Sequence, residues 1–355
     1  MSTLDDVLVS RARWTTLVGD VRETLRSVPD GCAQTCVTSP PYFGLRDYGA
    51  AGQIGHEASP REFVEALVGV MREVRRVLAD DGTLWLNIGD SYAAQGGGAQ
   101  GSTSQRVGRS NVAAQMKASS TKAPDGYKPK DLLGIPWRLA FALQDDGWYL
   151  RSDIIWAKPN PMPESVTDRP TRAHEYVFLL SKRARYFYDA DAIREAFADD
   201  RNGASGAVVR KGNPDRNDSG ATSAPTADGR NARDVWTITP EPFDGAHFAT
   251  MPPALARRCI LAGSRRGDIV LDPFGGAATT ALAALREGRR ALLCELNPDY
   301  VEIQRKRLAD DDIAAAHPTT VARDYIGQMS LFRSDDINPQ PTPKRARTKK
   351  TDAAA

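Results

Sequence analysis

Thr38-Ser39-Pro40-Pro41-Tyr42 is the segment around which the rest of the chain can be placed, and it follows the apolar residues 32–37. A short, partly β-branched run that ends in two prolines predicts a buried strand and then a rigid extended turn, because proline fixes its own φ and restricts the preceding residue. The turn then lies at the edge of an open α/β sheet where ligands bind. A hydroxyl, a rigid carbonyl and an aromatic face there suit a planar ring with an amine, such as a nucleobase. A stiff loop with a packed tyrosine is the alternative.

A second segment, Ile269-Val270-Leu271-Asp272-Pro273-Phe274-Gly275-Gly276-Ala277-Ala278-Thr279-Thr280, strengthens the first interpretation. It predicts an apolar strand, an acidic residue, a glycine turn and the start of a helix that continues over residues 281–287. Another strand is predicted at residues 290–294, directly before Glu295. In dinucleotide-binding folds, an acidic residue at this spacing accepts hydrogen bonds from ribose hydroxyls.

Together the two segments resemble those of the amino-methyltransferases of DNA. In that family S/D/N-P-P-Y/F is the catalytic turn, and D-P-F-x-G-x-G-T-T binds S-adenosyl-L-methionine. The catalytic turn comes first here and the cofactor segment much later, which is the permuted order of the family's β group. The resemblance covers roughly residues 14–308 and departs at Ala278, where the family has its second glycine.

The resemblance implies an α/β, Rossmann-like S-adenosylmethionine-dependent methyltransferase fold with a circularly permuted motif order. We expect residues 1–310 to form a mixed seven-stranded sheet with helices on both faces. The catalytic residues that the resemblance implies are Ser39, Pro40, Pro41 and Tyr42. The implied cofactor-binding residues are Asp20, Phe248, Pro252, Asp272, Pro273, Phe274, Gly275, Gly276, Thr279, Thr280, Glu295 and Asn297.

Contacts to DNA or to the target base are expected from Trp156, Lys158, Arg106, Arg109, Arg210 and Lys211. The first two belong to a W-x-K-P-N-P segment that resembles the one relatives place over an extruded base, where an aromatic plane and a cation are useful. A core position is the alternative for Trp156, and a surface turn acid is the alternative for Asp20.

The chain has 355 residues, of which 41% are hydrophobic and 26% charged, as is ordinary for a soluble α/β protein with a large core. No run of about 18 apolar residues is present, and residues 1–13 lack the apolar core of a signal peptide. We therefore expect a cytoplasmic protein, in a bacterium or a phage-infected host, with no membrane association.

Four cysteines, Cys32, Cys36, Cys259 and Cys294, have no paired spacing with one another or with histidine. Buried thiols are expected there, and no metal site. None of the four follows a proline. This excludes the thiolate chemistry of methylation at carbon 5 of cytosine, whereas methyl transfer to an exocyclic amine needs no covalent intermediate.

Two polar insertions and a basic tail are the candidate DNA-binding segments. Residues 93–130 are rich in Gly, Ser, Gln and Ala and suit a mobile loop that closes on DNA phosphates; plain disorder is the alternative. Residues 199–234 are expected to carry target recognition, as in relatives, and to order only on DNA. The tail, residues 311–355, is expected to be disordered and to add salt-sensitive, sequence-independent affinity through the five positive charges of residues 343–350; a solubilising end is the alternative.

The remaining pattern predicts alternating helices and strands. Ser59-Pro60-Arg61-Glu62 is a capping box for a helix that Asp80-Asp81-Gly82 would stop. Further helices are expected at residues 21–27, 132–143, 254–262 and 298–308, and further strands at residues 83–88, 148–156, 174–181 and, as an antiparallel edge partner, 185–188. Residues 14–20 are expected to form a short strand or a turn.

The hypothesis for the chemistry is methyl transfer to the exocyclic N4 amine of a flipped cytosine in double-stranded DNA. Cytosine is preferred because relatives with Ser at the position of Ser39 mostly methylate cytosine, whereas those with Asp there mostly methylate adenine. Adenine N6 is the alternative target. Two further hypotheses are an RNA or protein amide methyltransferase and a non-catalytic DNA-binding module. A cognate restriction endonuclease is a possible partner, and the enzyme is expected to be a monomer or a homodimer.

Overall fold

The computed structural model describes residues 2–44, 52–93, 123–196, 229–241 and 251–310. The chain divides into two units, residues 1–317 and 318–355, and the fold described here belongs to the first. The second unit lies outside the described residues, as do residues 311–317, so the expectation of a disordered basic tail stays a prediction.

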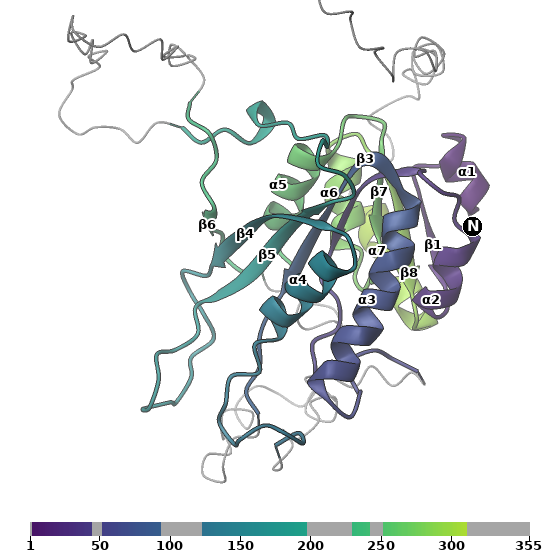
Figure 1. Cartoon of the computed structure of the whole chain (residues 1–355). Helices are drawn as coiled ribbons and strands as arrows, with labels where there is room; N and C mark the ends of the chain where they lie inside the picture. Colours follow the sequence, from purple (N-terminus) through teal and green to yellow (C-terminus); the bar gives the residue numbers. More distant parts are fainter. Residues whose placement is uncertain (1, 45–51, 94–122, 197–228, 242–250, 311–355) are drawn as a thin grey trace, which may run out of the picture. The chain divides into compact units, whose positions relative to one another are not determined.

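The described residues form one eight-stranded mixed sheet in the order β1-β8-β7-β2-β3-β5-β4-β6 (Figure 1). Only β5 runs against the other strands of this sheet, since β3 and β4 both pair with it in antiparallel fashion and the other pairs are parallel. The strands are β1 (Trp14–Val18), β2 (Ala33–Thr38), β3 (Leu78–Ile88), β4 (Tyr149–Ala157), β5 (His174–Ser181), β6 (Val235–Thr237), β7 (Ile269–Asp272) and β8 (Arg290–Glu295).

The expected count of seven strands was wrong, because the sheet has β6 as an additional strand. This strand pairs in parallel with the end of β4. The backbone of Ile155 donates to Asp234 over 2.8 Å, and Ile238 donates to Ala157 over 3.1 Å. The indole ring of Trp236 is buried on this strand. A strand of three residues is too short to show alternation, so the pattern gave no signal for it.

The predicted edge strand at residues 185–188 was also wrong, because this segment does not pair with the sheet. Its aromatic side chains pack on other parts of the protein. Phe187 lies beneath the guanidinium of Arg265, whose Cζ is 3.8 Å from the ring centroid. Tyr188 stacks on Trp85 with ring centroids 6.4 Å apart. The edge of the sheet next to β4 is taken by β6.

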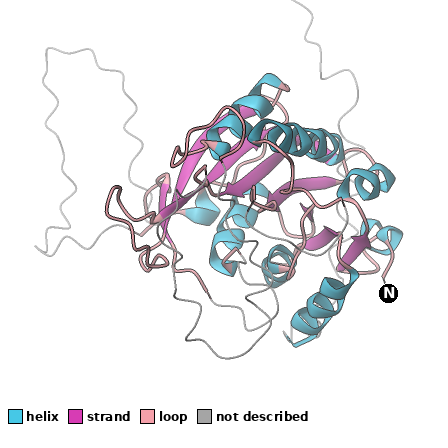
Figure 2. Ribbon diagram, turned by 90° about the horizontal axis from the view of Figure 1, so that it is seen from below, coloured by secondary structure: helices cyan, strands magenta, loops and turns pink. Residues whose placement is uncertain are grey.

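Helices cover both faces of the sheet, as Figure 2 shows from below the view of Figure 1. One face packs against α1 (Leu4–Leu8), α2 (Val21–Thr24), η1 (Leu25–Ser27), α3 (Pro60–Val77) and α4 (Ile135–Asp145). The other packs against η3 (Asp191–Ile193), α5 (Pro253–Gly263), α6 (Thr279–Arg286) and α7 (Pro298–Asp310). The expected two-sided α/β architecture is confirmed.

Helix α3 begins at its predicted cap, where the Ser59 hydroxyl accepts from the Glu62 backbone over 3.2 Å. It ends at Val77, and β3 starts at the next residue, so the predicted stop at residues 80–82 was wrong. A Cβ on Gly82 would lie 2.9 Å from the Ala79 carbonyl oxygen. This glycine therefore allows close backbone packing where the register of β2 against β3 shifts.

The permuted order creates a switch point between β7 and β2, which lie side by side in the sheet. α6 follows β7 on one face, whereas α3 follows β2 on the other. In open α/β sheets the crevice at such a point, beyond the carboxyl ends of the strands, is where ligands bind. Both predicted motifs end at this crevice.

Candidate active site

A direct hydrogen bond joins the two motifs at the switch point. The Thr38 hydroxyl, at the end of β2, donates to Oδ1 of Asp272, at the end of β7, over 2.6 Å. The Thr280 hydroxyl, in the first turn of α6, donates to the Val37 carbonyl over 3.1 Å. Asp272 is 4% exposed, and its burial raises the pKa of the carboxyl above the usual value. The structure thus brings together residues that lie 234 positions apart in the sequence.

Tyr42 contacts two neighbouring elements, β5 and the end of β3, as it leaves the catalytic turn. Its hydroxyl donates to Oε2 of Glu175, near the start of β5, over 2.6 Å. A Cβ on Gly89, just after β3, would be 2.8 Å from the tyrosine ring, so only glycine fits there. Burial, followed by the negative Glu175, raises the pKa of Tyr42 well above its ordinary value. The tyrosine is therefore a neutral hydrogen-bond donor at physiological pH.

Ser39 and Pro41 are half-buried and Pro40 is buried, so part of the turn faces the crevice. The Ser39 side chain and the Gly89 backbone both lie near enough to the Tyr42 hydroxyl to act on it as hydrogen-bond donors, which offsets part of the rise in its pKa. The predicted catalytic residues thus form one connected unit at the carboxyl end of β2.

Glu175 is a residue that sequence reasoning missed. Besides Tyr42, it accepts a 3.1 Å hydrogen bond from the Asn87 side-chain amide and forms an ion pair with Lys158. The Glu175 and Lys158 side chains are 15% and 20% exposed. An acid within an otherwise apolar strand was the available signal, but its partners come from three distant segments.

Trp156 and Lys158 lie at the end of β4, but their side chains are engaged within the protein. The indole is 4% exposed, and its Nε1 donates to the Ile238 carbonyl over 2.8 Å. The Lys158 ammonium lies 4.4 Å from the centroid of that ring. This arrangement favours the core alternative for Trp156 over direct stacking on a base.

The cofactor segment forms a compact turn between β7 and α6. The Gly275 backbone donates to the Cys294 carbonyl over 2.8 Å, and a Cβ on Gly275 would lie 3.1 Å from Leu293. Gly276 has a positive φ of 46°, and so does the non-glycine Ala278, with a φ of 59°. Alanine in the left-handed region is strained by about 1 to 2 kcal/mol. The departure from the family pattern is thus a local strain at the start of α6.

Glu295 closes this turn with both carboxylate oxygens. Oε2 accepts from the Gly276 backbone over 2.8 Å, and Oε1 accepts from the Asn297 backbone over 2.9 Å. Burial is the main reason that the pKa of Glu295 is raised to about 7. Each oxygen of a carboxylate can accept more than one hydrogen bond, so capacity remains for ribose hydroxyls.

Gln304 of α7 is a second residue that sequence reasoning missed. It is fully buried, donates to the Gly276 carbonyl over 2.9 Å and accepts from the Thr16 hydroxyl of β1 over 2.7 Å. Thr279 is also turned toward α7, where its hydroxyl accepts from Arg307 over 2.9 Å. These contacts fix the shape of the glycine turn from outside.

The other predicted cofactor residues surround the same edge. Asp20 caps α2 and pairs with Arg22, which lowers the pKa of the carboxyl and favours the turn-acid alternative. The Asn297 side chain accepts from the Asp299 backbone over 2.9 Å, as an N-cap does. Pro273 and Pro252 are buried, Phe274 is half-buried, and Phe248 lies outside the described residues.

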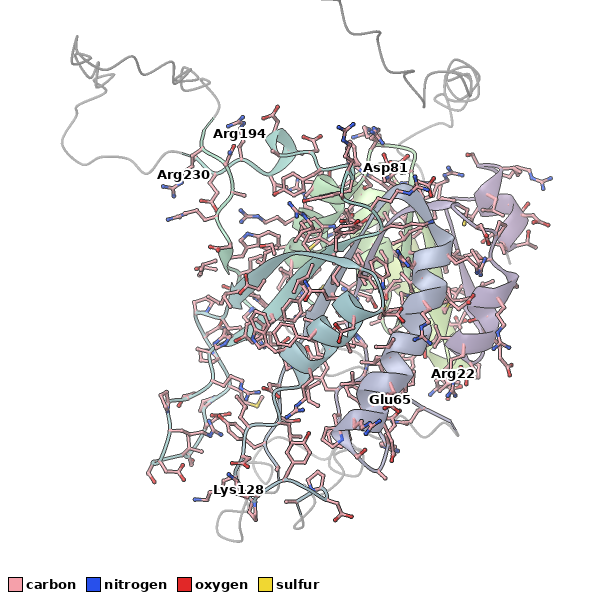
Figure 3. All side chains as sticks on the ribbon, in the orientation of Figure 1. Arg22, Glu65, Asp81, Lys128, Arg194 and Arg230 are labelled. Atoms are coloured by element: carbon pink, nitrogen blue, oxygen red, sulfur yellow. The ribbon has the colours of Figure 1, made fainter. Side chains whose placement is uncertain are left out.

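The ends of both insertions are more ordered than expected. Ala93 is buried and accepts from the Lys130 backbone over 2.7 Å, so the first insertion begins and ends at one point. Glu195 and Arg230 exchange two backbone hydrogen bonds of 2.9 Å at the base of the second. Arg106, Arg109, Arg210 and Lys211 lie outside the described residues. Figure 3 shows Arg230 and Lys128 at opposite ends of the sheet.

Three of the four cysteines, Cys36, Cys259 and Cys294, are buried free thiols as expected, whereas Cys32 is half-buried. In the described ranges, no three or more His, Cys, Asp or Glu side chains come together as metal ligands would. Within those same ranges, no helix has the length and apolar character to span a membrane.

The fold and the paired turns define the class of open α/β methyltransferases with a permuted motif order. The chain belongs to the N6/N4 DNA methylase family, whose model matches residues 33–306. It is 48% identical over 294 residues to the type II methyltransferase M.Cfr9I of Citrobacter freundii, covering 83% of this chain and 87% of that protein. It is 47% identical over 292 residues to M.SmaI of Serratia marcescens, covering 82% and 89%.

Solved structures agree with the fold. A candidate DNA modification methylase of Thermus thermophilus, complexed with S-adenosyl-L-methionine, has a TM-score of 0.52 at 24% identity, covering 82% of this chain and 92% of that one. The cytosine-N4-specific PvuII DNA methyltransferase has a TM-score of 0.55 at 19% identity, covering 85% and 93%. The family model and the two relatives, not these structures, show that the chain is a DNA methyltransferase, an enzyme class whose methyl donor is S-adenosyl-L-methionine.

Proposed function

We propose that this enzyme methylates the exocyclic N4 amine of a cytosine flipped out of duplex DNA. The observation that carries the proposal is the 2.6 Å bond between Thr38 and Asp272, which makes the Ser39 turn and the cofactor turn immediate neighbours. A group that accepts hydrogen bonds from an amine therefore sits next to the place where a methyl donor would be held. Proximity and orientation of this kind lower the barrier of a transfer reaction.

The residues present fit the methyl donor. Glu295 is a buried carboxylate with a raised pKa, and hydroxyl donors from a ribose would stabilise its charge. The turn from Asp272 to Thr280 would hold the methionine part, with the half-buried Gly276 presenting no side chain there. When bound, the sulfonium of S-adenosyl-L-methionine supplies an electrophilic methyl group.

The chain's part in the chemistry is to reshape the amine. The nitrogen lone pair of an exocyclic amine is delocalised into the ring, so a planar amine is a poor nucleophile. The Ser39 hydroxyl oxygen and the Pro40 carbonyl would accept hydrogen bonds from the two N–H groups and favour a tetrahedral nitrogen. Tyr42 would stack on the extruded ring, which is worth about 1 to 3 kcal/mol per base. No strong general base is needed, because methylation makes the nitrogen acidic.

Ser39 also supports cytosine over adenine. A hydroxyl accepts and donates, so it can bond the amine while its own proton bonds elsewhere, whereas a carboxylate only accepts. Both bases carry an amine beside a ring nitrogen, so the difference tunes preference without excluding adenine.

Nucleoside analysis of DNA treated with the purified enzyme and methyl-labelled cofactor tests the target base. We expect N4-methylcytosine, formed much more slowly when Ser39→Ala replaces the wild type. If N6-methyladenine were the only product, the cytosine assignment would be wrong while the amine-methylating mechanism would stand.

We also propose that the enzyme acts in the cytoplasm as the modification partner of a cognate restriction endonuclease.

The first insertion begins and ends next to β3, by the site, and the second is anchored at the opposite end of the sheet. Methylation-sensitive sequencing of DNA from expressing cells would give the recognition sequence. Replacing residues 199–228 should change that sequence, whereas removing the tail from residue 318 should only weaken binding and flatten its salt dependence.

A further inference from the structure

A chain of hydrogen bonds runs from the catalytic turn to a charged pair on the neighbouring strands. The Tyr42 hydroxyl donates to Glu175 over 2.6 Å, Glu175 pairs with Lys158, and the Ser39 side chain lies within reach of the tyrosine oxygen on the other side. Segments that are far apart in the sequence meet along this chain. The mechanism above uses its first two members but assigns nothing to the other two.

The charge of Glu175 fixes the donor and the acceptor of each hydrogen bond in this series. An ionised carboxylate has no proton and can only accept, so the proton between Tyr42 and Glu175 belongs to the tyrosine. Because the tyrosine has given its only proton to Glu175, a hydrogen bond between Ser39 and the tyrosine oxygen can only be donated by Ser39. In this arrangement the single Ser39 proton points at Tyr42, and the serine lone pairs are left for another donor.

Hydrogen-bond donors and a cation face both carboxylate oxygens of Glu175. The Lys158 ammonium faces one carboxylate oxygen, and the Asn87 amide donates to the other over 3.1 Å. The Lys158 ammonium is also held 4.4 Å from the Trp156 ring centroid, so the cation stays beside Glu175. Asn87 donates its second proton to the Tyr176 carbonyl over 3.1 Å, which fixes its amide orientation.

We propose that Glu175 is a positioning residue that, acting through Tyr42, turns Ser39 into a committed acceptor for the target amine. This inference rests on the proposed role of Ser39 in accepting a hydrogen bond from the amine. Without the negative charge, the chain could reverse, and the serine would point its proton at the amine in some molecules. Those molecules would bind DNA and cofactor but would not align the nitrogen.

Two variants interrupt this series of hydrogen bonds at different residues. Glu175→Gln replaces the obligate acceptor with an amide that can donate or accept, and Tyr42→Phe keeps the ring for stacking but removes the hydroxyl. Each should lower kcat about tenfold to a hundredfold, as expected for a lost hydrogen bond to a charged group. The KM for DNA and the Kd for S-adenosyl-L-methionine should change by less than about threefold.

The double variant separates this role from a structural one. If both residues act through one chain, the double variant should be no slower than the slower single variant, whereas independent losses would multiply. Glu287→Gln is the matched control: this carboxylate pairs with Arg257, is 18% exposed and lies at the far end of α6. It should keep the wild-type kcat.

Wild-type kcat in a folded Glu175→Gln variant, or multiplying losses in the double variant, would overturn the inference. Should Glu175→Gln fail to fold, Tyr42→Phe carries the test, since it removes one oxygen atom, and wild-type kcat in that variant would overturn the inference as well. Failure of the underlying function looks different: Ser39→Ala would then keep the wild-type kcat, whatever the Glu175 variant does.

Discussion

The cofactor half and the catalytic half of the site differ in the groups that their acidic residues bind. In the cofactor half, Glu295 bonds Gly276 and Asn297, which are 19 and 2 residues away. In the catalytic half, Tyr42 bonds Glu175 over a separation of 133 residues. One half is built from backbone N–H groups around buried acids, and the other from side chains of different strands.

This difference predicts a division of labour. Backbone donors near a glycine turn provide a fixed surface for binding, whereas a side-chain network can set the direction of individual protons. Substitutions in the cofactor half should therefore change cofactor affinity, and substitutions in the catalytic half should change turnover. The following experiments test whether the two halves separate in this way.

Ser39→Ala is expected to have the largest effect. It removes a preorganised acceptor in the transition state, so kcat should fall by about 10²- to 10³-fold. Because Ser39 is absent from the cofactor half, the affinity for S-adenosyl-L-methionine, measured by calorimetry, should stay unchanged. A parallel loss of cofactor affinity would show that the two halves are not separable.

Glu295→Ala should show the reverse pattern. Losing hydrogen bonds to a charged acceptor should weaken cofactor binding by about 10- to 100-fold, with kcat at saturating cofactor nearly unchanged. The variant should also melt at a lower temperature, because the Gly276 and Asn297 backbone groups lose their acceptor. Unchanged cofactor affinity in the folded variant would remove Glu295 from the site.

Cofactor affinity should rise as the pH rises through about 7, because the pKa of Glu295 is raised to about 7 and the ionised form accepts best. Fold stability should change in the opposite direction. The folded pKa lies above the ordinary value of 4.5, so this contribution is fully present below pH 4.5 and is lost as the pH rises through 7. Glu295→Gln should abolish both trends in calorimetric and thermal-melting titrations. Identical pH profiles for the two proteins would assign the trends to another group.

Ala278→Gly should have the smallest effect and should concern stability alone. Its left-handed backbone costs alanine about 1 to 2 kcal/mol, part of which the greater entropy of unfolded glycine offsets. The variant should be about 1 kcal/mol more stable in denaturant unfolding and should keep its cofactor affinity. A less stable variant would indicate that packing of the buried Ala278 methyl group outweighs the strain.

Sequence alone was sufficient wherever the signal is local. The predicted strand at residues 174–181 matches β5, and the Asp272 segment forms the expected strand, turn and helix. The signals are the hydrophobic period, turns with proline or glycine, and acidic residues at strand ends. Each spans only a few residues, so it can be recognised without knowledge of the fold. The positions of Ser39, Tyr42 and Glu295 follow from such signals.

Tertiary structure decided which distant side chains meet. The sheet order brings Glu175 to Tyr42 and Gln304 to Gly276, and it buries Trp156, for which the sequence left two roles open. Strand pairing and helix packing select one neighbour among many chemically equivalent residues, and no pattern within a single segment encodes that selection. The sequence therefore identified the two turns. The hydrogen-bond network that orients the hydroxyl protons of the catalytic turn forms only when the strands of the sheet come together.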